Sequence, residues 1–216
     1  MGANMKEIIL KNKVKAIIRE ANVEDAKNIT SYLNKIGGES DFLIFGKNEF
    51  NMSLEAEEDY IKSQYYMDNS IMVITLINNK IVSIGAISSN SKSRTKHIGT
   101  IGISVLKEYW SLGIANEVMN YLIDFASSNN VTKKLALLVR EDNYKAIKLY
   151  KKFKFEKEGL LKNDICINNN FYNTITMGLL LKKDGVCKIK CVFFQKVVII
   201  KILNIINEKE GAHFLC

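Results

Sequence analysis

The order of apolar and polar positions divides the chain into helices and strands. Apolar residues at helical spacing predict helices over residues 23–36 and 54–67, and a third that includes Val118 to Phe125 and ends within residues 127–130. Apolar and mostly β-branched runs predict seven strands, over residues 14–19, 71–77, 81–88, 94–105, 135–139, 155–167 and 171–181. This alternation indicates a mixed α/β protein.

Two asparagine-rich segments join consecutive predicted strands. Residues 78–80, Asn-Asn-Lys, are a strong hairpin signal because asparagine tolerates the left-handed backbone that a tight turn requires. Residues 168–170, all asparagine, separate the last two strands, which we expect to pair. Neither an internal repeat nor a flexible linker divides this part of the chain.

The segment from Gly102 to Ala115, GISVLKEYWSLGIA, runs from a strand through a short turn into a helix. A helix that starts after small residues directs several free backbone N–H groups one way, and its dipole adds roughly half a positive charge there. Gly113 and Ala115 let a ligand approach the backbone closely. The segment therefore predicts a phosphate-binding site.

A second segment, EDNYKAIKLYKKFKFE over residues 141–156, opens a helix at the cap residues Asp142 and Asn143 and then returns to a strand. Together the two segments resemble the acetyl-CoA-binding motifs of the GNAT N-acetyltransferases, which are a strand, Gln/Arg-x-x-Gly-x-Gly/Ala and, later, Asn-x-x-Ala-x-x-x-Tyr-x-x-x-Gly-Phe. The resemblance covers about residues 15–181. Within the family, the ribosomal-protein-alanine acetyltransferase-like subgroup is similar.

This resemblance implies a central mixed, largely antiparallel sheet of about seven strands flanked by helices. It also implies an enzyme that transfers acetyl from acetyl-CoA to a primary amine by direct attack on the thioester, with no metal. The amine is a small amine or polyamine, or else a protein N-terminus or lysine. The runner-up function is an acyl-CoA-binding regulatory or interaction module with little turnover.

The resemblance also implies roles for particular residues. Ile103 and Val105 would pair with the pantetheine arm, and an N–H near Val105 would face the thioester oxygen. Asn143 would hydrogen-bond the same arm, and Tyr150 would protonate the departing sulfur. The pyrophosphate would lie on the backbone amides of Trp110, Ser111, Leu112, Gly113, Ile114 and Ala115.

Three positions depart from the family pattern. Trp110 stands where the pattern has Gln or Arg, so a side-chain contact to phosphate is lost while the backbone contacts are kept. Lys154 replaces the glycine before Phe155, where a left-handed turn would cost roughly 1 kcal/mol. Leu138 stands where ribosomal-protein acetyltransferases carry a glutamate base.

The family pattern therefore does not identify the general base in this sequence. We take Glu39 as a tentative base because it lies in the loop GGESDFLIFG, residues 37–46, which either floors a substrate pocket or packs a connection. The alternatives are Asp41, Glu141, His97 or a chain of water molecules.

Composition narrows the remaining possibilities. The four cysteines form no C-x-x-C pair and there are two histidines, so neither a zinc site nor a disulfide framework is predicted. We expect a cytoplasmic protein because the N-terminus has no apolar signal core. The formal charge is +8, and no stripe of lysine and arginine interleaves with aromatic residues, so nucleic-acid binding is not expected.

The last part of the chain differs from the rest. We predict an acetyltransferase domain over residues 1–185 and a C-terminal extension of unknown role over residues 186–216. Residues 191–206 are too short and too charged to span a membrane, and they suit either an amphipathic helix, at a membrane surface or a subunit contact such as a homodimer, or a strand.

Overall fold

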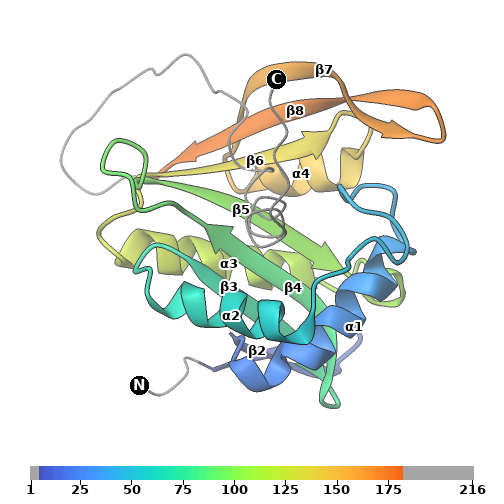
Figure 1. Ribbon diagram of the computed structural model, residues 1–216, viewed down its shortest axis with the longest axis vertical. Helices are drawn as coiled ribbons and strands as arrows, with labels where there is room; N and C mark the ends of the chain where they lie inside the picture. Colours follow the sequence, from blue (N-terminus) through green and yellow to red (C-terminus); the bar gives the residue numbers. More distant parts are fainter. Residues whose placement is uncertain (1–4, 182–216) are drawn as a thin grey trace. The chain divides into compact units, whose positions relative to one another are not determined.

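The structure, a computed structural model, describes residues 5–181 and forms one eight-stranded sheet flanked by helices (Figure 1). The strand order is β1-β2-β3-β4-β5-β6-β8-β7, and every neighbouring pair is antiparallel except β5 and β6. The strands are β1 (Lys6–Ile9), β2 (Lys15–Glu20), β3 (Ile71–Ile77), β4 (Lys80–Ser88), β5 (Ile98–Val105), β6 (Lys134–Arg140), β7 (Glu156–Ile167) and β8 (Asn170–Leu180). The helices are α1 (Ala26–Gly37), α2 (Leu54–Tyr65), α3 (Ile114–Ser128) and α4 (Tyr144–Lys152), with short 3-10 turns η1 (Val23–Asp25) and η2 (Lys107–Tyr109).

The mixed, largely antiparallel fold is thus confirmed, with one strand more than the seven predicted. Strand β1 escaped prediction because its four residues are too few to show a period. The predicted strand from residue 94 begins only at Ile98, because residues 92–97 form a turn in which the amides of Thr95 and Lys96 both donate to the Lys92 carbonyl.

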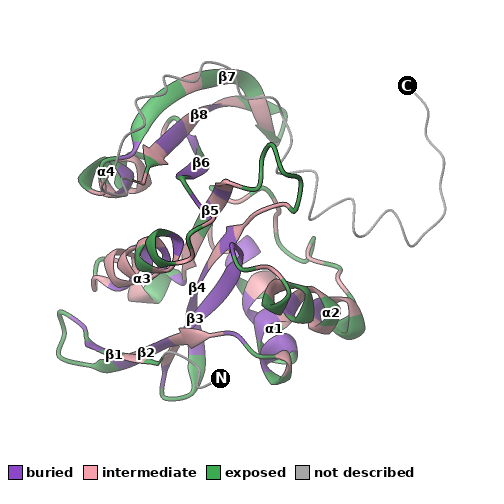
Figure 2. Ribbon diagram, turned by 90° about the vertical axis from the view of Figure 1, so that its left-hand side faces the viewer, coloured by how far each residue is buried: buried purple, intermediate pink, exposed green. Residues whose placement is uncertain are grey.

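The helices cover both faces of the sheet. Helices α1 and α2 lie on one face and α3 and α4 on the other (Figure 2). One apolar cluster joins α1 and α2 to the sheet through Ile29, Ile61 and Ile84. The other joins α3 and α4 to it through residues such as Val118, Leu135 and Tyr150.

Both predicted asparagine hairpins are present. Asn78 and Asn79 have φ of 49° and 61°, and Asn168 and Asn169 have φ of 49° and 60°. Two successive positive φ angles define the turn whose twist matches that of paired strands. Lys154, predicted to carry a strained turn, has φ of 67°.

Strands β5 and β6 pair over only three residues and then separate. The parallel register joins residues 98–100 to residues 134–136, after which β5 continues to Val105 beside β4 alone. Beyond this point β6 pairs only with β8. We call the space between residues 101–105 and 137–140 the strand gap; it is the structural feature on which the candidate site is built.

The predictions for residues 186–216 lie outside the described residues. None of the helices within residues 5–181 combines the length and hydropathy that crossing a bilayer requires.

Candidate active site

The open edge of β5 presents backbone groups to the strand gap. The Leu106 amide donates to the Val82 carbonyl at 3.0 Å, so even-numbered residues of β5 direct their backbone groups toward β4. The N–H groups of Ile103 and Val105 therefore point the other way, into the strand gap. This edge can pair with an extended ligand as another strand would.

The glycine loop lies at the end of this strand. Ser111 and Gly113 both have positive φ, 64° and 101°, and a Cβ added at Gly113 would meet no atom within 4 Å. Within the described chain, no backbone or side-chain acceptor is assigned to the five consecutive amides of residues 111–115, which precede or open helix α3. Free amides at a helix start, with the helix dipole behind them, form an anion site that suits a pyrophosphate.

Trp110 braces this loop instead of contributing a phosphate-binding side chain. Its indole Nε1 donates to the Val105 carbonyl at 2.7 Å, which satisfies a β5 acceptor that faces the strand gap. The Lys145 ammonium lies 5.2 Å from the centre of the indole ring. The departure from the family motif therefore gives a contact that fixes the loop against the end of β5.

Tyr150 and Asn143 belong to α4, on the same face of the sheet as α3. The Tyr150 ring is buried, lies 5.9 Å from the Phe155 ring and packs in the cluster that also holds Ile114 and Val139. Burial raises the pKa of the Tyr150 phenol to about 12. The phenol is therefore protonated at neutral pH, as a proton donor must be.

Asn143 caps helix α4. Its side-chain Oδ1 accepts from the Ala146 amide at 3.2 Å, which leaves the Nδ2 group to donate elsewhere. The predicted contact to the pantetheine arm and the cap are therefore compatible.

The segment between α1 and α2, residues 38–53, spans the open end of the strand gap. At the β5 end, a Glu39 carboxylate oxygen accepts from the Lys107 amide at 2.9 Å, and the other lies 3.5 Å from the Lys35 ammonium. At the β6 end, the Arg140 guanidinium donates to the Asp41 carbonyl at 2.9 Å. We call this segment, which contacts both sides of the gap, the acceptor loop.

Arg140 was not predicted from the sequence. Its guanidinium pairs with both oxygens of Asp142 at 2.7 Å and lies between the rings of Phe42, at 4.6 Å, and Tyr172, at 4.0 Å. This pairing raises the pKa of Arg140 and lowers that of Asp142. A single arginine at the end of a strand gives no sequence signal for partners this far apart in the chain.

The alternative base candidates are dispersed. Glu141 accepts from Asn173 Nδ2 at 2.8 Å, while His97 lies in the turn before β5, where its carbonyl accepts from the Lys133 and Lys134 amides. Leu138 is 36% exposed and, by strand alternation, shares the face of Arg140. No group of His, Cys, Asp or Glu within residues 5–181 has a metal-binding arrangement.

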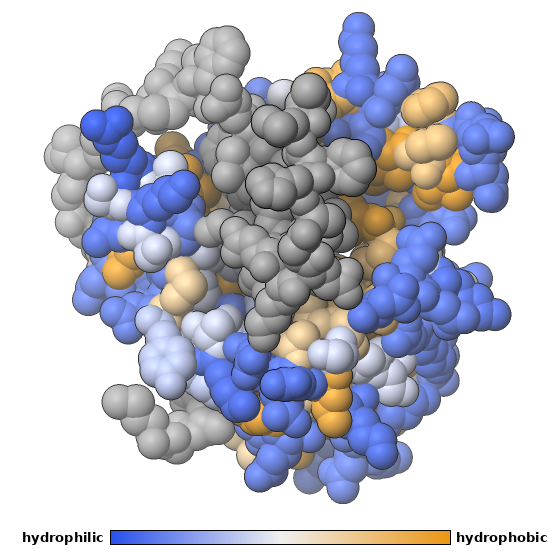
Figure 3. All heavy atoms as spheres, in the orientation of Figure 1, coloured by the Kyte–Doolittle hydropathy of each residue, from blue (hydrophilic) through white to orange (hydrophobic). Residues whose placement is uncertain are grey.

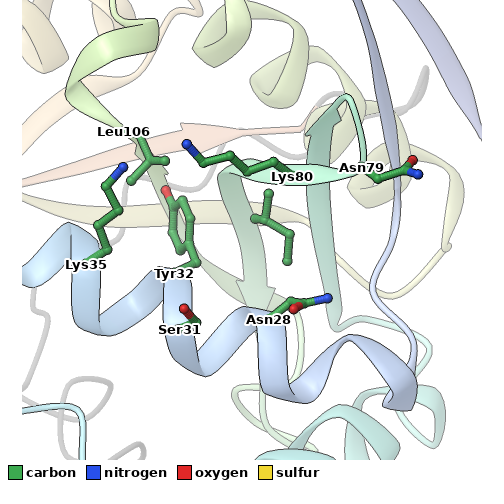
Figure 4. A pocket seen from close by; sticks show the side chains of 8 residues that line it. Asn28, Ser31, Tyr32, Lys35, Asn79, Lys80 and Leu106 are labelled. Atoms are coloured by element: carbon green, nitrogen blue, oxygen red, sulfur yellow. The ribbon is translucent and has the colours of Figure 1, made fainter.

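The described surface on the face of α1 and α2 is mostly hydrophilic, with smaller apolar areas (Figure 3). A separate cavity of about 300 Å³ lies between α1 and the β3–β4 turn (Figure 4). Its two lysines, Lys35 and Lys80, both bond Glu108, at 3.2 and 3.1 Å. Its lining includes none of the residues predicted to bind acetyl-CoA, so we place the site at the strand gap.

Comparisons with known proteins show the family to which the chain belongs. The sequence model of the Acetyltransferase (GNAT) family matches residues 43–155, more than half of the chain. A GNAT-family acetyltransferase from Streptococcus pneumoniae, solved by crystallography, superimposes with a TM-score of 0.75 at 30% identity, over 76% of this chain and 99% of that one. The chain therefore belongs to the GNAT acetyltransferase family.

Two further relatives are informative. The L-amino acid N-acetyltransferase AaaT of Escherichia coli is 28% identical over 106 residues, which are 49% of this chain and 65% of AaaT. The protein yncA of Salmonella typhimurium, solved with its cofactor acetyl-CoA, has a TM-score of 0.69 at 13% identity, over 82% of this chain and 99% of that one. At that identity the likeness shows the fold, and the ribosomal-protein subgroup stays a prediction.

Proposed function

We propose that the chain is an acetyl-CoA-dependent N-acetyltransferase that acetylates a primary amine by direct attack on the thioester. The observation that carries the proposal is the continuity of two backbone surfaces: the open edge of β5 ends where the free amides of residues 111–115 begin. A ligand with an extended amide-bearing arm and a pyrophosphate, as coenzyme A has, matches that order.

Backbone groups also supply the stabilisation that acyl transfer needs. An N–H that points from Val105 into the strand gap donates to the thioester oxygen as negative charge develops on it. Loss of one such donor typically costs about 3 to 4 kcal/mol of transition-state stabilisation. The amine nitrogen forms its bond to the carbonyl carbon, and the carbon–sulfur bond breaks.

Tyr150 serves as the proton donor to the leaving thiolate. Because burial holds its pKa at about 12, the phenol donates a hydrogen bond as the sulfur gains charge, and the proton released from nitrogen restores it. Glu39 stays the base predicted from the sequence. Its contacts with the Lys107 amide and Lys35 also give it the task of holding the acceptor loop at the end of β5.

For the acceptor, we propose a small amine or polyamine first and a protein N-terminus or lysine second. The likeness to AaaT, named as an amino acid acetyltransferase, supports the first class. The test is release of free thiol from acetyl-CoA with a panel of amines, together with calorimetric titration of acetyl-CoA. Tight binding without turnover of any amine would contradict the enzyme and favour a binding module.

A further inference from the structure

The guanidinium of Arg140, the last residue of β6, is buried and paired on every nitrogen. Its side chain is 7% exposed. Nε and one terminal nitrogen donate to the two oxygens of Asp142 at 2.7 Å, and the other terminal nitrogen donates to the Asp41 carbonyl at 2.9 Å. The guanidinium carbon lies 4.6 Å from the centre of the Phe42 ring and 4.0 Å from that of Tyr172. A side chain paired in this way holds other segments in place and is not available to bind a ligand.

Two of these partners belong to the acceptor loop, which runs from the end of α1 to the start of α2 (Figure 1). Arg140 contacts this loop through the Asp41 carbonyl and the Phe42 ring. Glu39, two residues before Asp41, accepts from the Lys107 amide just beyond the end of β5. Because two steps of an extended chain cover at most about 7 Å, this short stretch of the loop crosses the strand gap from the β5 side to the β6 side.

Arg140 and Tyr150 lie on opposite faces of the sheet. Leu137 and Val139 of β6 pack in the apolar cluster that also holds Tyr150, on the face of α3 and α4. Successive side chains of a strand alternate between the two faces, so Arg140 lies on the face of α1 and α2. The acceptor loop is therefore on the face opposite the proposed proton donor.

We propose that Arg140 is a positioning residue, which holds the acceptor loop across the strand gap and thereby sets the affinity for the amine acceptor. The inference rests on the proposed function, in which the Val105 N–H faces the thioester oxygen. Lys107, which the loop contacts through Glu39, is only two residues beyond Val105. An amine that reaches the thioester carbon from the face of α1 and α2 therefore passes beside the loop that Arg140 holds.

The attachment acts on the acceptor and not on the coenzyme. Acetyl-CoA is proposed to bind the open edge of β5 and the amides of residues 111–115, none of which contacts Arg140. When the loop is released from β6, these backbone groups stay in place while the surface beside the amine is lost. Loss of the Arg140 contacts should therefore raise the KM for the amine and leave the affinity for acetyl-CoA unchanged.

The test compares Arg140→Met with a control on the neighbouring strand, Thr174→Val. Methionine keeps an unbranched side chain between the two rings but donates no hydrogen bond. Thr174 lies opposite Arg140 on β8, is 2% exposed, and donates from its hydroxyl to Asp164 at 2.6 Å. Valine at this position removes a hydrogen bond from β8 and none from the acceptor loop. Both variants should fold with lowered melting temperatures.

Steady-state kinetics use the amine that the wild-type protein acetylates best. We expect Arg140→Met to raise the KM for this amine about 10-fold, with kcat within about threefold of the wild type and acetyl-CoA affinity unchanged by calorimetry. Thr174→Val should keep the wild-type KM. Phe42→Leu should also raise KM, and its combination with Arg140→Met should add little, because both changes break the same attachment.

Trypsin cleavage after Lys47, an exposed residue of the acceptor loop, reports the attachment without any amine. Arg140→Met should speed this cleavage of the folded protein severalfold, as followed by mass spectrometry of the fragment 1–47, and Thr174→Val should not. Unchanged cleavage, an unchanged KM, or a joint weakening of KM and acetyl-CoA affinity in Arg140→Met would each overturn the inference. A wild-type protein that acetylates no amine would instead overturn the proposed function, while the cleavage rates would still show whether Arg140 holds the loop.

Discussion

Substitution of Gly113 tests the backbone amide site in two steps. The residue has φ of 101° and an added Cβ would meet no atom within 4 Å, so the Cβ of a substituted residue causes no clash in the free protein. The cost is conformational, about 1 to 3 kcal/mol for a non-glycine residue in this region, and less for alanine than for branched valine. Both variants should therefore fold, with lowered melting temperatures.

The loss of acetyl-CoA affinity is a separate effect from this cost to folding stability. Hydrogen bonds to charged groups contribute about 1.5 to 3 kcal/mol each, and a side chain at Gly113 holds a pyrophosphate away from at least one amide. Because about 1.4 kcal/mol changes affinity tenfold, Gly113→Ala should weaken acetyl-CoA about 10-fold and Gly113→Val at least 100-fold.

Calorimetric titration of the folded variants measures these affinities. Acetyl-pantetheine, which lacks the pyrophosphate, serves as the control ligand and should lose little affinity in either variant. A folded Gly113→Val protein that binds acetyl-CoA as tightly as the wild type would refute the assignment of the pyrophosphate to this loop.

Three other substitutions have separate readouts. Tyr150→Phe should lower turnover 10²- to 10⁴-fold. Acetyl-CoA affinity and melting temperature should change little, since the Tyr150 hydroxyl has no hydrogen-bond partner within residues 5–181. Near-normal turnover would contradict the role of Tyr150 as the acid. Lys154→Gly should relieve the φ of 67° and stabilise by about 1 kcal/mol, or roughly 2 to 4 °C by calorimetry, and an unchanged melting temperature would show that the turn is not strained. Burial raises the pKa of the Glu57 carboxyl from 4.5 in the unfolded chain to about 7 in the folded protein, so the free energy of unfolding should fall by about 3 kcal/mol as pH increases between these values. In chemical denaturation, Glu57→Gln should lack this dependence on pH.

Local chemistry explains which parts of the fold could be predicted. The asparagine turns at residues 78–79 and 168–169 follow from the backbone preference of asparagine, and helix α3 follows from its apolar period. Strand β1 was not predicted because four residues carry too little pattern. The predicted start of β5 was wrong because β-branched composition does not reveal the turn before Ile98.

The geometry of the candidate site could be predicted where it depends on the local backbone, and not where distant segments meet. The free amides near Gly113 follow from a glycine at a helix start, which the sequence displays. The sandwich of Arg140 between Phe42 and Tyr172 depends on three segments that only the tertiary structure unites. Glu57 lies in LEAEEDYIK, where four acids suggest an exposed helix, and its burial depends on how α2 packs on the sheet.

The two substrates are thus expected to be recognised by different kinds of group. In the proposed site, acetyl-CoA contacts backbone amides of β5 and the glycine loop, so Trp110, whose indole donates to the Val105 carbonyl, can replace the motif side chain without loss of these contacts. The acceptor is expected to contact side chains of the acceptor loop, which hydrogen bonds of Glu39 and Arg140 join to the sheet. Since side chains change with single substitutions and backbone amides do not, acceptor specificity should vary among related chains more readily than coenzyme binding, and residues 38–53 are where that variation should act.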